Sequence, residues 1–319
     1  MTLARFFIAA MAAVSIASCS NSKSSSSPAT DGTANPDDNV PVGLSGNTLK
    51  VVIPTHTVEA GDSFECYYTD VTTDRDIFVN ASTGKQGPGG HHITIYYAQV
   101  SQPPGHHKCI DVEMAEWRQV GAAGDAKGDG VIDLPPGIAV RVPAGKQMVV
   151  QTHYINASGK PKDVEDEITV HLLAREDVKR FAQGFAVVDG TFEIPPHANY
   201  SRTATCTPKR DLDLIMVLGH MHERGLHYKL EHLDANGKLL ETILDQDWEM
   251  AFTSHPPTKR WSPEQPYKIK TGDRLRQTCT WKNAEDEKLL FPREMCVAFS
   301  MYLDDDGFID CAAQPDEAK

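Results

Sequence analysis

Residues 212–225 read LDLIMVLGHMHERG, and the rest of the fold is organised around this stretch. Its first seven residues are largely apolar and are typical of a buried β-strand that ends at Gly219. Side chains alternate between the two faces of a strand, so His220 and His222 point the same way. Two imidazoles on one face form a ready pair of metal ligands. For this motif alone, two surface histidines at a strand end are an equal alternative.

The N-terminus has the composition of an export signal. Residues 1–18 contain Arg5 and then an apolar run that is too short to remain in a bilayer as a spanning helix. Residues 16–19, Ile-Ala-Ser-Cys, match the bacterial lipobox pattern, in which Cys19 is the lipidated residue; a plain signal peptide and a chance match are the alternatives. Residues 19–46 are rich in Ser, Asp, Asn, Pro and Gly, which predicts a disordered tether. We expect an exported protein, lipid-anchored to a bacterial membrane and facing the periplasm or the cell surface.

Charge and cysteine content narrow the class of protein further. The net charge of −13 argues against a nucleic-acid partner and against adhesion to anionic lipid by charge. Attachment to a membrane is therefore expected through the N-terminal lipid anchor, and no protein partner is predicted. Six cysteines remain besides Cys19, and an even number in an exported chain suggests disulfides with many possible connectivities. None lies in a CxxC pair, so a zinc-thiolate site or a thioredoxin-like motif is not expected.

Short β-prone runs broken by Gly and Pro follow residue 47, and helical periodicity is almost absent. The turn Asn236-Gly237 between two of these runs predicts a β-hairpin. The sequence predicts an all-β fold of two tandem antiparallel jelly-roll-like β-sandwich domains, 47–175 and 176–319, divided at the polar run 175–179. The predicted strands are 49–53, 77–80, 93–99, 138–142, 148–155, 168–174, 184–188, 200–206, 212–218, 226–233, 239–245, 274–281 and 297–303.

Two further histidine motifs and one methionine are candidates for metal ligation. His91 and His92 open a β-prone run, and both can reach one metal if the strand is locally bent. His153 lies in an apolar strand, where a buried imidazole needs a partner, so a core histidine bonded to a carbonyl is the alternative. Met295 precedes Cys296 and the last apolar strand, although a lone methionine is more often core filler than a ligand.

The other histidines are predicted not to bind metal. His106 and His107 form a second adjacent pair after the turn Pro103-Pro104-Gly105, but no strand geometry supports them as ligands. The remaining ones are expected to be surface residues or locally hydrogen-bonded: His56, His171, His197, His227, His232 and His255.

In order and spacing, these motifs resemble the copper type II, ascorbate-dependent monooxygenases, the family of the peptidylglycine α-hydroxylating and dopamine β-monooxygenase enzymes. The resemblance covers roughly residues 47–311. It implies two jelly-roll-like β-sandwiches that face each other across a solvent-filled cleft, with one copper site in each. The motifs that carry it are Gly90-His91-His92, Gln151-Thr152-His153-Tyr154, His220-Met221-His222, Cys279 and Glu294-Met295-Cys296.

The resemblance also implies the role of each ligand. Imidazole suits Cu(II), and the soft thioether favours Cu(I). A site with a thioether therefore fits reduced copper that binds O₂, whereas an all-histidine site fits a one-electron store. The implied first copper ligands are His91, His92 and His153, and the implied second copper ligands, which are also the catalytic residues, are His220, His222 and Met295. The implied disulfides are Cys66–Cys109, Cys206–Cys311 and Cys279–Cys296.

The sequence departs from the peptide-amidating members of this family. They have an arginine two residues before the His-x-His pair, which holds the substrate carboxylate, and this chain has Leu218 there. They also have Asn and Tyr after the Met-Cys step, where this chain has Val297 and Phe299. We therefore expect an apolar pocket without a fixed cation, and a substrate that is neutral or keeps any charge at the solvent-filled cleft.

The sequence thus predicts a dicopper monooxygenase, an enzyme that hydroxylates a C–H bond of a small organic substrate. It would use O₂ and an external one-electron donor such as ascorbate. The alternative is a copper-binding lipoprotein without turnover, acting in sensing, scavenging or delivery. A zinc hydrolase with Glu223 as the base is a third reading, against which Met295 argues because zinc gains nothing from a thioether.

Overall fold

The computed structural model describes residues 44–109, 116–124, 129–130, 133–253, 255–291 and 293–316. All of them lie in one compact unit, Asn39–Lys319. The predicted signal peptide, Cys19 and most of the predicted tether lie outside the described residues. Besides strands, these residues include two short 3-10 helices, η2 (Arg175–Asp177) and η3 (Met250–Thr253). No helix in this part of the chain is long and apolar enough to cross a membrane.

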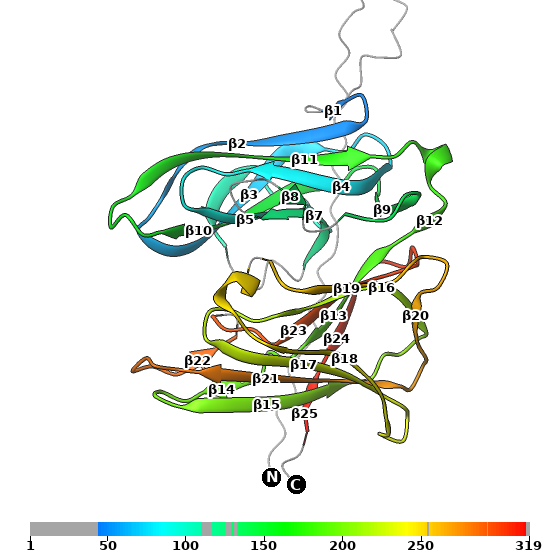
Figure 1. Ribbon diagram of the computed structural model, residues 1–319. Coiled ribbons are helices and arrows are strands. Elements are labelled where there is room, and N and C mark those ends of the chain that lie inside the picture. Colours follow the sequence, from blue (N-terminus) through cyan, green and yellow to red (C-terminus); the bar gives the residue numbers. More distant parts are fainter. Residues whose placement is uncertain are drawn as a thin grey trace, which may run out of the picture. The chain divides into compact units, whose positions relative to one another are not determined.

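The strands up to β12 form two sheets that pack face to face, which we call the first sandwich (Figure 1). One sheet has the order β1-β2-β11-β4-β9-β12 and the other has the order β6-β3-β10-β5-β7-β8. Their described pairings are antiparallel except that β12 runs parallel to β9. The bounds are β1 Leu44–Ser45, β2 Thr48–Val58, β3 Gly61–Thr72, β4 Ile77–Lys85, β5 Gly90–Ala98, β6 Gly105–Lys108, β7 Trp117–Gly124, β8 Asp129–Gly130, β9 Ile138–Val142, β10 Gln147–Asn156, β11 Lys162–Leu172 and β12 Arg180–Phe181.

The strands from β13 onward form the second sandwich (Figure 1). A sheet of order β19-β16-β23-β13-β24, with β20 also on β16, packs against a sheet of order β18-β17-β21-β15-β25. β14 and β22 pair separately, and β13 and β24 are parallel. The bounds are β13 Gln183–Val188, β14 Glu193–Ile194, β15 Asn199–Cys206, β16 Leu212–His220, β17 Gly225–Leu233, β18 Leu239–Asp247, β19 Thr258–Arg260, β20 Tyr267–Ile269, β21 Arg274–Lys282, β22 Leu289–Leu290, β23 Val297–Tyr302, β24 Ile309–Ala312 and β25 Gln314–Pro315.

Alternating side chains hold the layers of each sandwich together. In β2, Leu49, Val51 and Ile53 are at most 2% exposed, while the residues between them point to solvent. Each such aliphatic side chain contributes about 1.5–3 kcal/mol when it is fully buried. Each sandwich has its own apolar core, and a third cluster that includes Val140 and Met216 draws residues from both.

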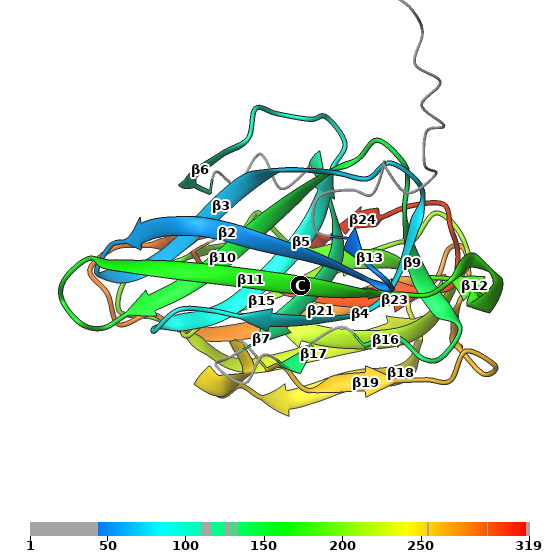
Figure 2. The same ribbon diagram turned by 90° about the horizontal axis from the view of Figure 1, so that it is seen from above.

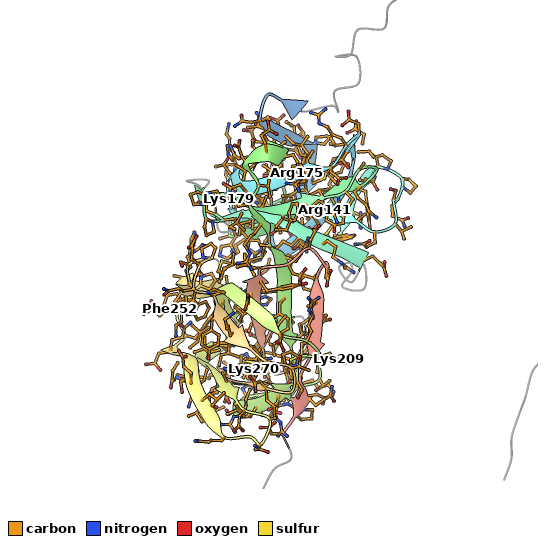
Figure 3. The ribbon with its side chains drawn as sticks, turned by 90° about the vertical axis from the view of Figure 1, so that its right-hand side faces the viewer. Arg141, Arg175, Lys179, Lys209, Phe252 and Lys270 are labelled. Atoms are coloured by element: carbon orange, nitrogen blue, oxygen red, sulfur yellow. A yellow bond between two sulfur atoms is a disulfide. The ribbon has the colours of Figure 1, made fainter. Side chains whose placement is uncertain are left out.

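In the segment between the two sandwiches, two arginines pack against the ring of Phe181. Figure 2 shows β2 and β11 running side by side in the outer sheet, and β12 follows β11 through η2. Arg141 and Arg175, labelled in Figure 3, place their guanidinium carbons 5.9 and 5.4 Å from the centroid of the Phe181 ring. Arg141 also forms an ion pair of 2.8 Å with Asp305 of the second sandwich. These contacts tie β12, and the loop between β23 and β24 of the second sandwich, to β9 of the first.

The all-β prediction is confirmed, and each predicted strand overlaps an observed one. The Asn236-Gly237 turn joins β17 to β18 as expected, with Gly237 at a φ of 84° that favours glycine. The sequence reading missed β3, β6 and β7 among others, and it did not foresee the two parallel pairs. The predicted domain boundary at 175/176 stays a prediction, although the sheets change partners between Phe181 and Gln183.

Three disulfides join the same cysteine pairs that the family resemblance implies. They are Cys66–Cys109, Cys206–Cys311 and Cys279–Cys296. In the second sandwich, Cys279 lies on β21 and Cys296 directly precedes β23, so this bond links the two facing sheets.

Candidate metal centres

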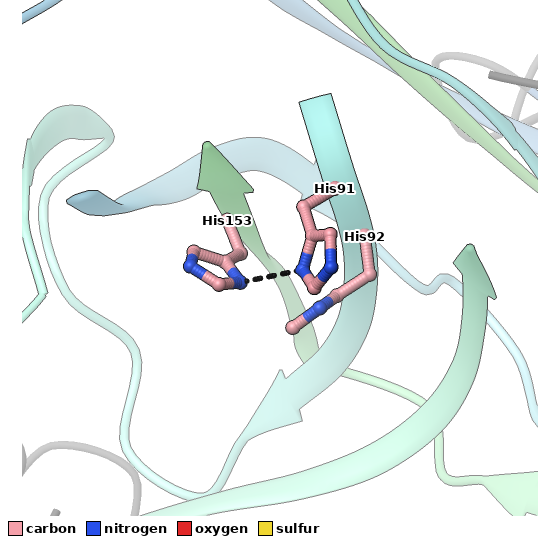
Figure 4. A group of neighbouring side chains, drawn as sticks. All are labelled: His91, His92 and His153. Carbon is pink, nitrogen blue, oxygen red and sulfur yellow. Dashed lines mark hydrogen bonds between the residues drawn. The ribbon is translucent and has the colours of Figure 1, made fainter. Parts of the chain in front are cut away.

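Three histidines of the first sandwich meet at the start of β5. The imidazoles of His91, His92 and His153 each offer a nitrogen, and these nitrogens lie within 4.8 Å of one another (Figure 4). His153 pairs with His92 in the register of β10 and β5, whereas its neighbour Tyr154 pairs with Gly90. His91 is thus the extra residue of a β-bulge, which bends the strand and lets adjacent side chains reach the same point. This local bend is the condition that the sequence reading set for the pair.

Hydrogen bonds fix the orientation of His153 in this trio. Its Nε2 donates to Asp62 Oδ1 at 2.9 Å, so its Nδ1 carries a lone pair. That Nδ1 lies 3.0 Å from His91 Nδ1, as drawn in Figure 4. The Phe64 ring stacks on His153 at a centroid distance of 4.1 Å and an interplanar angle of 7°. Two nitrogens that share one proton at this distance can hold a metal cation at the same place.

Two members of the trio, His91 and His92, are poised in the neutral state that metal ligation requires. Burial, followed by the nearby His153, lowers the pKa of His91 to about 4. The same two causes, with His91 in addition, hold the pKa of His92 well below its ordinary value. The donor set therefore fits a metal that prefers imidazole, such as copper.

The second centre is built at the end of β16. His220 is its last residue and His222 follows in a turn, with ring centroids 5.1 Å apart. His220 pairs with Val297 at the start of β23, and continuing this antiparallel register by two residues brings Met295 opposite His222. Burial is the main cause that lowers the pKa of His220 and of His222. Two neutral imidazoles and a thioether sulfur are thus offered on one side of the second sandwich.

A buried carboxyl group shapes the turn that carries His222. Glu294, which is 1% exposed, accepts hydrogen bonds from the backbone N–H groups of His222 and Arg224 and from the Trp281 indole. Burial raises the pKa of Glu294 to about 7, although these donors oppose that shift. His222 Nδ1 donates to the carbonyl of Arg293 at 3.0 Å. This bond assigns the proton to Nδ1 and leaves Nε2 as the ligand atom.

Both centres reach one cavity of about 440 Å³. Its polar wall includes His92 from the trio and both histidines of the second centre, and Met295 lies in the same lining. Its apolar wall is formed by Val120, Ala122, Val140, Met216, Leu218, Phe299, Met301 and Phe308. Leu218 and Phe299 line the cavity as expected, whereas Val297 is buried elsewhere. One cation, the exposed Lys108 of β6, lies in the lining, and the expectation of a pocket without a fixed cation stays a prediction.

Asp62 and Phe64 are functional-site residues that the sequence reading missed. Phe64 stacks on His153 and also lies 6.5 Å, centroid to centroid, from His222 of the other cluster. Asp62 bonds to His153 and shares a hydrogen bond with Glu223. Burial works to raise the pKa of Asp62, but the hydrogen bond and charge of His153 outweigh it and leave the pKa lowered. Both residues lie on β3, and this strand was not predicted because polar residues interrupt its apolar pattern.

Glu223 is already engaged by neighbouring groups. It hydrogen-bonds to Asp62 and forms a 3.2 Å ion pair with Arg224. Burial, followed by the charge of Asp62, raises the pKa of Glu223. A carboxyl group held between an acid and an arginine is poorly placed to act as the free base of a zinc hydrolase.

These observations define an all-β protein in which two sandwiches bring imidazoles and one thioether to a shared cavity. Residues 182–318 match the family model of the copper type II ascorbate-dependent monooxygenase, C-terminal domain. This match covers the part of the chain that carries His220, His222 and Met295, and it supports a relation to that family. The match begins after the first sandwich, so it does not include the histidine trio. No curated protein matches the sequence.

Solved structures with a related arrangement are distant. PNGase F, a glycosylasparaginase from Flavobacterium meningosepticum, is 8% identical, with a TM-score of 0.39 over 84% of this chain and 100% of that chain. A chain of the Sulfolobus turreted icosahedral virus is 10% identical, with a TM-score of 0.23 over 81% of this chain and 56% of that one. At these scores the likenesses carry no argument about function.

Proposed function

We propose that this protein is a dicopper monooxygenase that hydroxylates a C–H bond of a small organic substrate with O₂ and an external reductant such as ascorbate. One observation carries the proposal: two imidazole clusters of different composition, only one of them beside a methionine, reach the same cavity. The family match over residues 182–318 supports the copper- and ascorbate-dependent scaffold. The alternative is a copper-binding protein without turnover on this scaffold.

Each centre has its own set of proposed copper ligands. His91, His92 and His153 would hold a copper of the first sandwich, and His220, His222 and Met295 would hold one of the second. Copper, when bound, supplies one-electron chemistry and, at a thioether-containing site, affinity for O₂ in the reduced state. Asp62 keeps the Nε2 proton of His153 in place, and the Arg293 carbonyl does the same for Nδ1 of His222. Both bonds fix the tautomer and the ring orientation of a ligand.

The cavity wall supports a largely apolar substrate. Leu218, Phe299 and Met301 lie beside the second centre, and a carboxylate against them would be left unpaired at a cost of several kcal/mol, on the order of 2–7 kcal/mol. Lys108 lies in the same lining but on β6, beside Glu65 in the strand register. We propose a neutral aromatic or aliphatic group next to Met295, with any acidic group of the substrate directed toward Lys108.

Export and membrane attachment are part of the proposal. The lipobox pattern around Cys19 supports a lipid anchor on a bacterial membrane, with the tether 19–46 leading to the sandwiches. Small-molecule substrate and O₂ are the proposed partners, with neither nucleic acid nor another protein required.

The test combines copper content with substrate oxidation. The full chain, loaded with copper, is supplied with ascorbate and isotopically labelled O₂ and screened against aromatic and aliphatic compounds in pairs that differ by one carboxylate. We expect two coppers per chain and label incorporated into a hydroxylated product. Two bound coppers with no ascorbate-dependent O₂ consumption and no product would support the copper-binding alternative instead.

Met295 offers a matched pair of variants. Met295→Leu keeps size and apolarity, so the free energy of unfolding should change by less than about 1.5 kcal/mol. It should nevertheless abolish hydroxylation and the Cu–S contribution to the X-ray absorption spectrum of the reduced protein. Met250→Leu alters an exposed methionine outside the cavity lining and should leave both intact. Equal activity of the two variants would remove Met295 from the proposed catalytic set.

A further inference from the structure

A second group of histidines and carboxylates lies inside the first sandwich, away from the cavity of the two centres. His56 comes from β2 and Asp166 from β11 of one sheet, while Glu65 comes from β3 and His106 from β6 of the facing sheet. The side chains of His56, Asp166 and Glu65 are 5%, 0% and 3% exposed. The sequence reading placed His106 in a loop without strand geometry and His56 among surface or locally bonded residues. The prediction for His106 is wrong, because His106 lies on a strand. His56 is buried but is hydrogen-bonded locally to the Pro54 carbonyl, which is one of its two predicted states.

Two atoms at the centre of this group face each other without a hydrogen bond. His56 Nδ1 lies 3.2 Å from the Pro54 carbonyl and donates to it, which leaves Nε2 as the free nitrogen of the ring. Asp166 Oδ1 accepts from the Tyr154 hydroxyl and from the Gly87 amide, whereas Asp166 Oδ2 has no donor. Nε2 and Oδ2 are both buried, both lack a hydrogen-bond partner and lie 3.7 Å apart.

This separation is too long for a hydrogen bond. Two buried electron-rich atoms that face each other repel unless a positive charge lies between them. With ligand bonds of roughly 2.0–2.2 Å, as in zinc sites, the 3.7 Å separation corresponds to a ligand–metal–ligand angle of about 125°. That angle lies close to the tetrahedral arrangement that zinc prefers.

The facing sheet supplies two more donors nearby. The His106 ring lies 4.4 Å from the His56 ring, centroid to centroid, and its Nε2 is 3.4 Å from Glu65 Oε2. The ligand atoms of these four residues lie farther apart than those of the trio of the first centre. His106 is the least buried of the four, at 31% side-chain exposure. Burial raises the pKa of Glu65 and of Asp166, although the charge of Lys108 opposes this shift at Glu65 and the Tyr154 hydrogen bond opposes it at Asp166.

We propose that His56 and Asp166, together with His106 and Glu65, form a separate binding site for a divalent cation of the zinc type. Two imidazoles and two carboxylates are ligands that Zn²⁺ accepts in proteins. The site is independent of the copper proposal, since it shares no residue with either centre. It joins β2 and β11 to β3 and β6, so a bound ion would link the two sheets of the first sandwich directly.

The test counts bound zinc in a set of variants of the full chain. Equilibrium dialysis against Zn²⁺, followed by elemental mass spectrometry, gives the equivalents bound to the wild type, His56→Gln and Asp166→Asn. We expect each variant to bind one equivalent fewer than the wild type, whatever number the histidines of the other centres bind. His106→Gln should weaken zinc binding at this site at least tenfold. His197→Gln is the matched control, because His197 pairs with Asp286 at 2.8 Å on the exposed surface.

Two further measurements keep the test decisive. Circular dichroism verifies that the variants are folded, and Co²⁺ added to the wild type should give a visible absorption band that His56→Gln lacks. His153→Ala, which alters the trio, should keep this band. Equal zinc content in the wild type, His56→Gln and Asp166→Asn would overturn the proposal and leave an ordered water molecule as the occupant of the gap.

Discussion

The two candidate copper centres differ in how the fold holds their ligands. His153 lies within β10 and is paired on both sides, with β3 and β5, so the sheet fixes its backbone. His222 and Met295 lie just beyond the ends of β16 and β23, where Glu294 and the Arg293 carbonyl hold the turn. The first centre is therefore set by sheet register, and the second by a few local polar bonds. A centre of the second kind adapts more readily to a changing ligand geometry.

The largest difference between the centres should appear when one ligand is removed. His153→Ala should abolish copper binding in the first sandwich and leave the second centre loaded, because the two ligand sets share no residue. Hydroxylation should then be lost although half of the copper remains. Elemental analysis with electron paramagnetic resonance measures both. His171→Ala alters another histidine of the first sandwich, bound to Thr83 Oγ1 at 3.3 Å, and should keep both coppers. Loss of both coppers from His153→Ala would mean one shared site.

The next effect tests how closely the second centre depends on the end of β16. A Cβ on Gly219 would come within 2.3 Å of the Tyr228 ring, which is fully buried and cannot move aside. Overpacking of this kind costs about 1–3 kcal/mol, so Gly219→Ala should lower the free energy of unfolding by that amount. It should also displace His220 and weaken copper binding in the second centre only. Urea denaturation and copper titration provide the readouts. Gly105→Ala, where no atom lies within 4 Å of the added Cβ, should change neither.

A smaller effect sharpens the contrast between the two orienting bonds. Asp62 orients His153 through a carboxylate, whereas a backbone carbonyl orients His222. Removing such a carboxylate partner costs about 10–100-fold in metal affinity. Asp62→Asn should therefore weaken copper binding in the first centre by this factor and spare the second, as measured by competition with a chelator. Asp70→Asn, at an exposed position of the same strand, is the control. An equal loss at both centres would show that Asp62 acts on the shared cavity as a whole.

The smallest effect concerns pH in the metal-free protein. The folded-state pKa of His91 is about 4, below its ordinary value of 6.5, so the folded chain binds fewer protons than the unfolded chain between these values. The free energy of unfolding should be fully retained above the ordinary pKa and should fall as the pH drops toward 4. Denaturation of the metal-free chain across this range measures the slope. His91→Asn should reduce this slope, to which His92, His220 and His222 also contribute, and His227→Asn, which alters a histidine outside both centres, should leave it unchanged.

Much of the fold could be predicted because apolar and β-branched runs mark its buried strands. β9 was located to the residue, and β16 was located by the apolar run before Gly219. β3 escaped because Glu65 and Thr69 occupy buried positions and break the alternation of polar and apolar residues. β7 escaped because its end, Gly-Ala-Ala-Gly, has low strand propensity.

The candidate ligands were predictable for a different reason. Imidazole and thioether side chains are rare enough that their spacing carries information, and the structure brings the trio together and the second set to one cavity wall. Their supporting residues were not predictable, since Asp62 and Phe64 owe their roles to strand pairing across more than 80 residues, as in the 91-residue separation of Asp62 and His153. The cationic contribution of Lys108 to the cavity was missed for the same reason, because it depends on the pairing of β6 with β3.

The Cys279–Cys296 disulfide has a consequence for when the second centre can form. It anchors the residue directly after Met295 to the opposite sheet, so the thioether is held in position only once both sulfurs are oxidised. In a thiol-rich compartment such as the bacterial cytoplasm this bond does not persist. A newly made chain would then carry the two histidines without a fixed sulfur ligand beside them. If the chain is exported and binds copper as proposed, the disulfide would act as a maturation checkpoint that delays a complete second centre until the chain has left the cell interior.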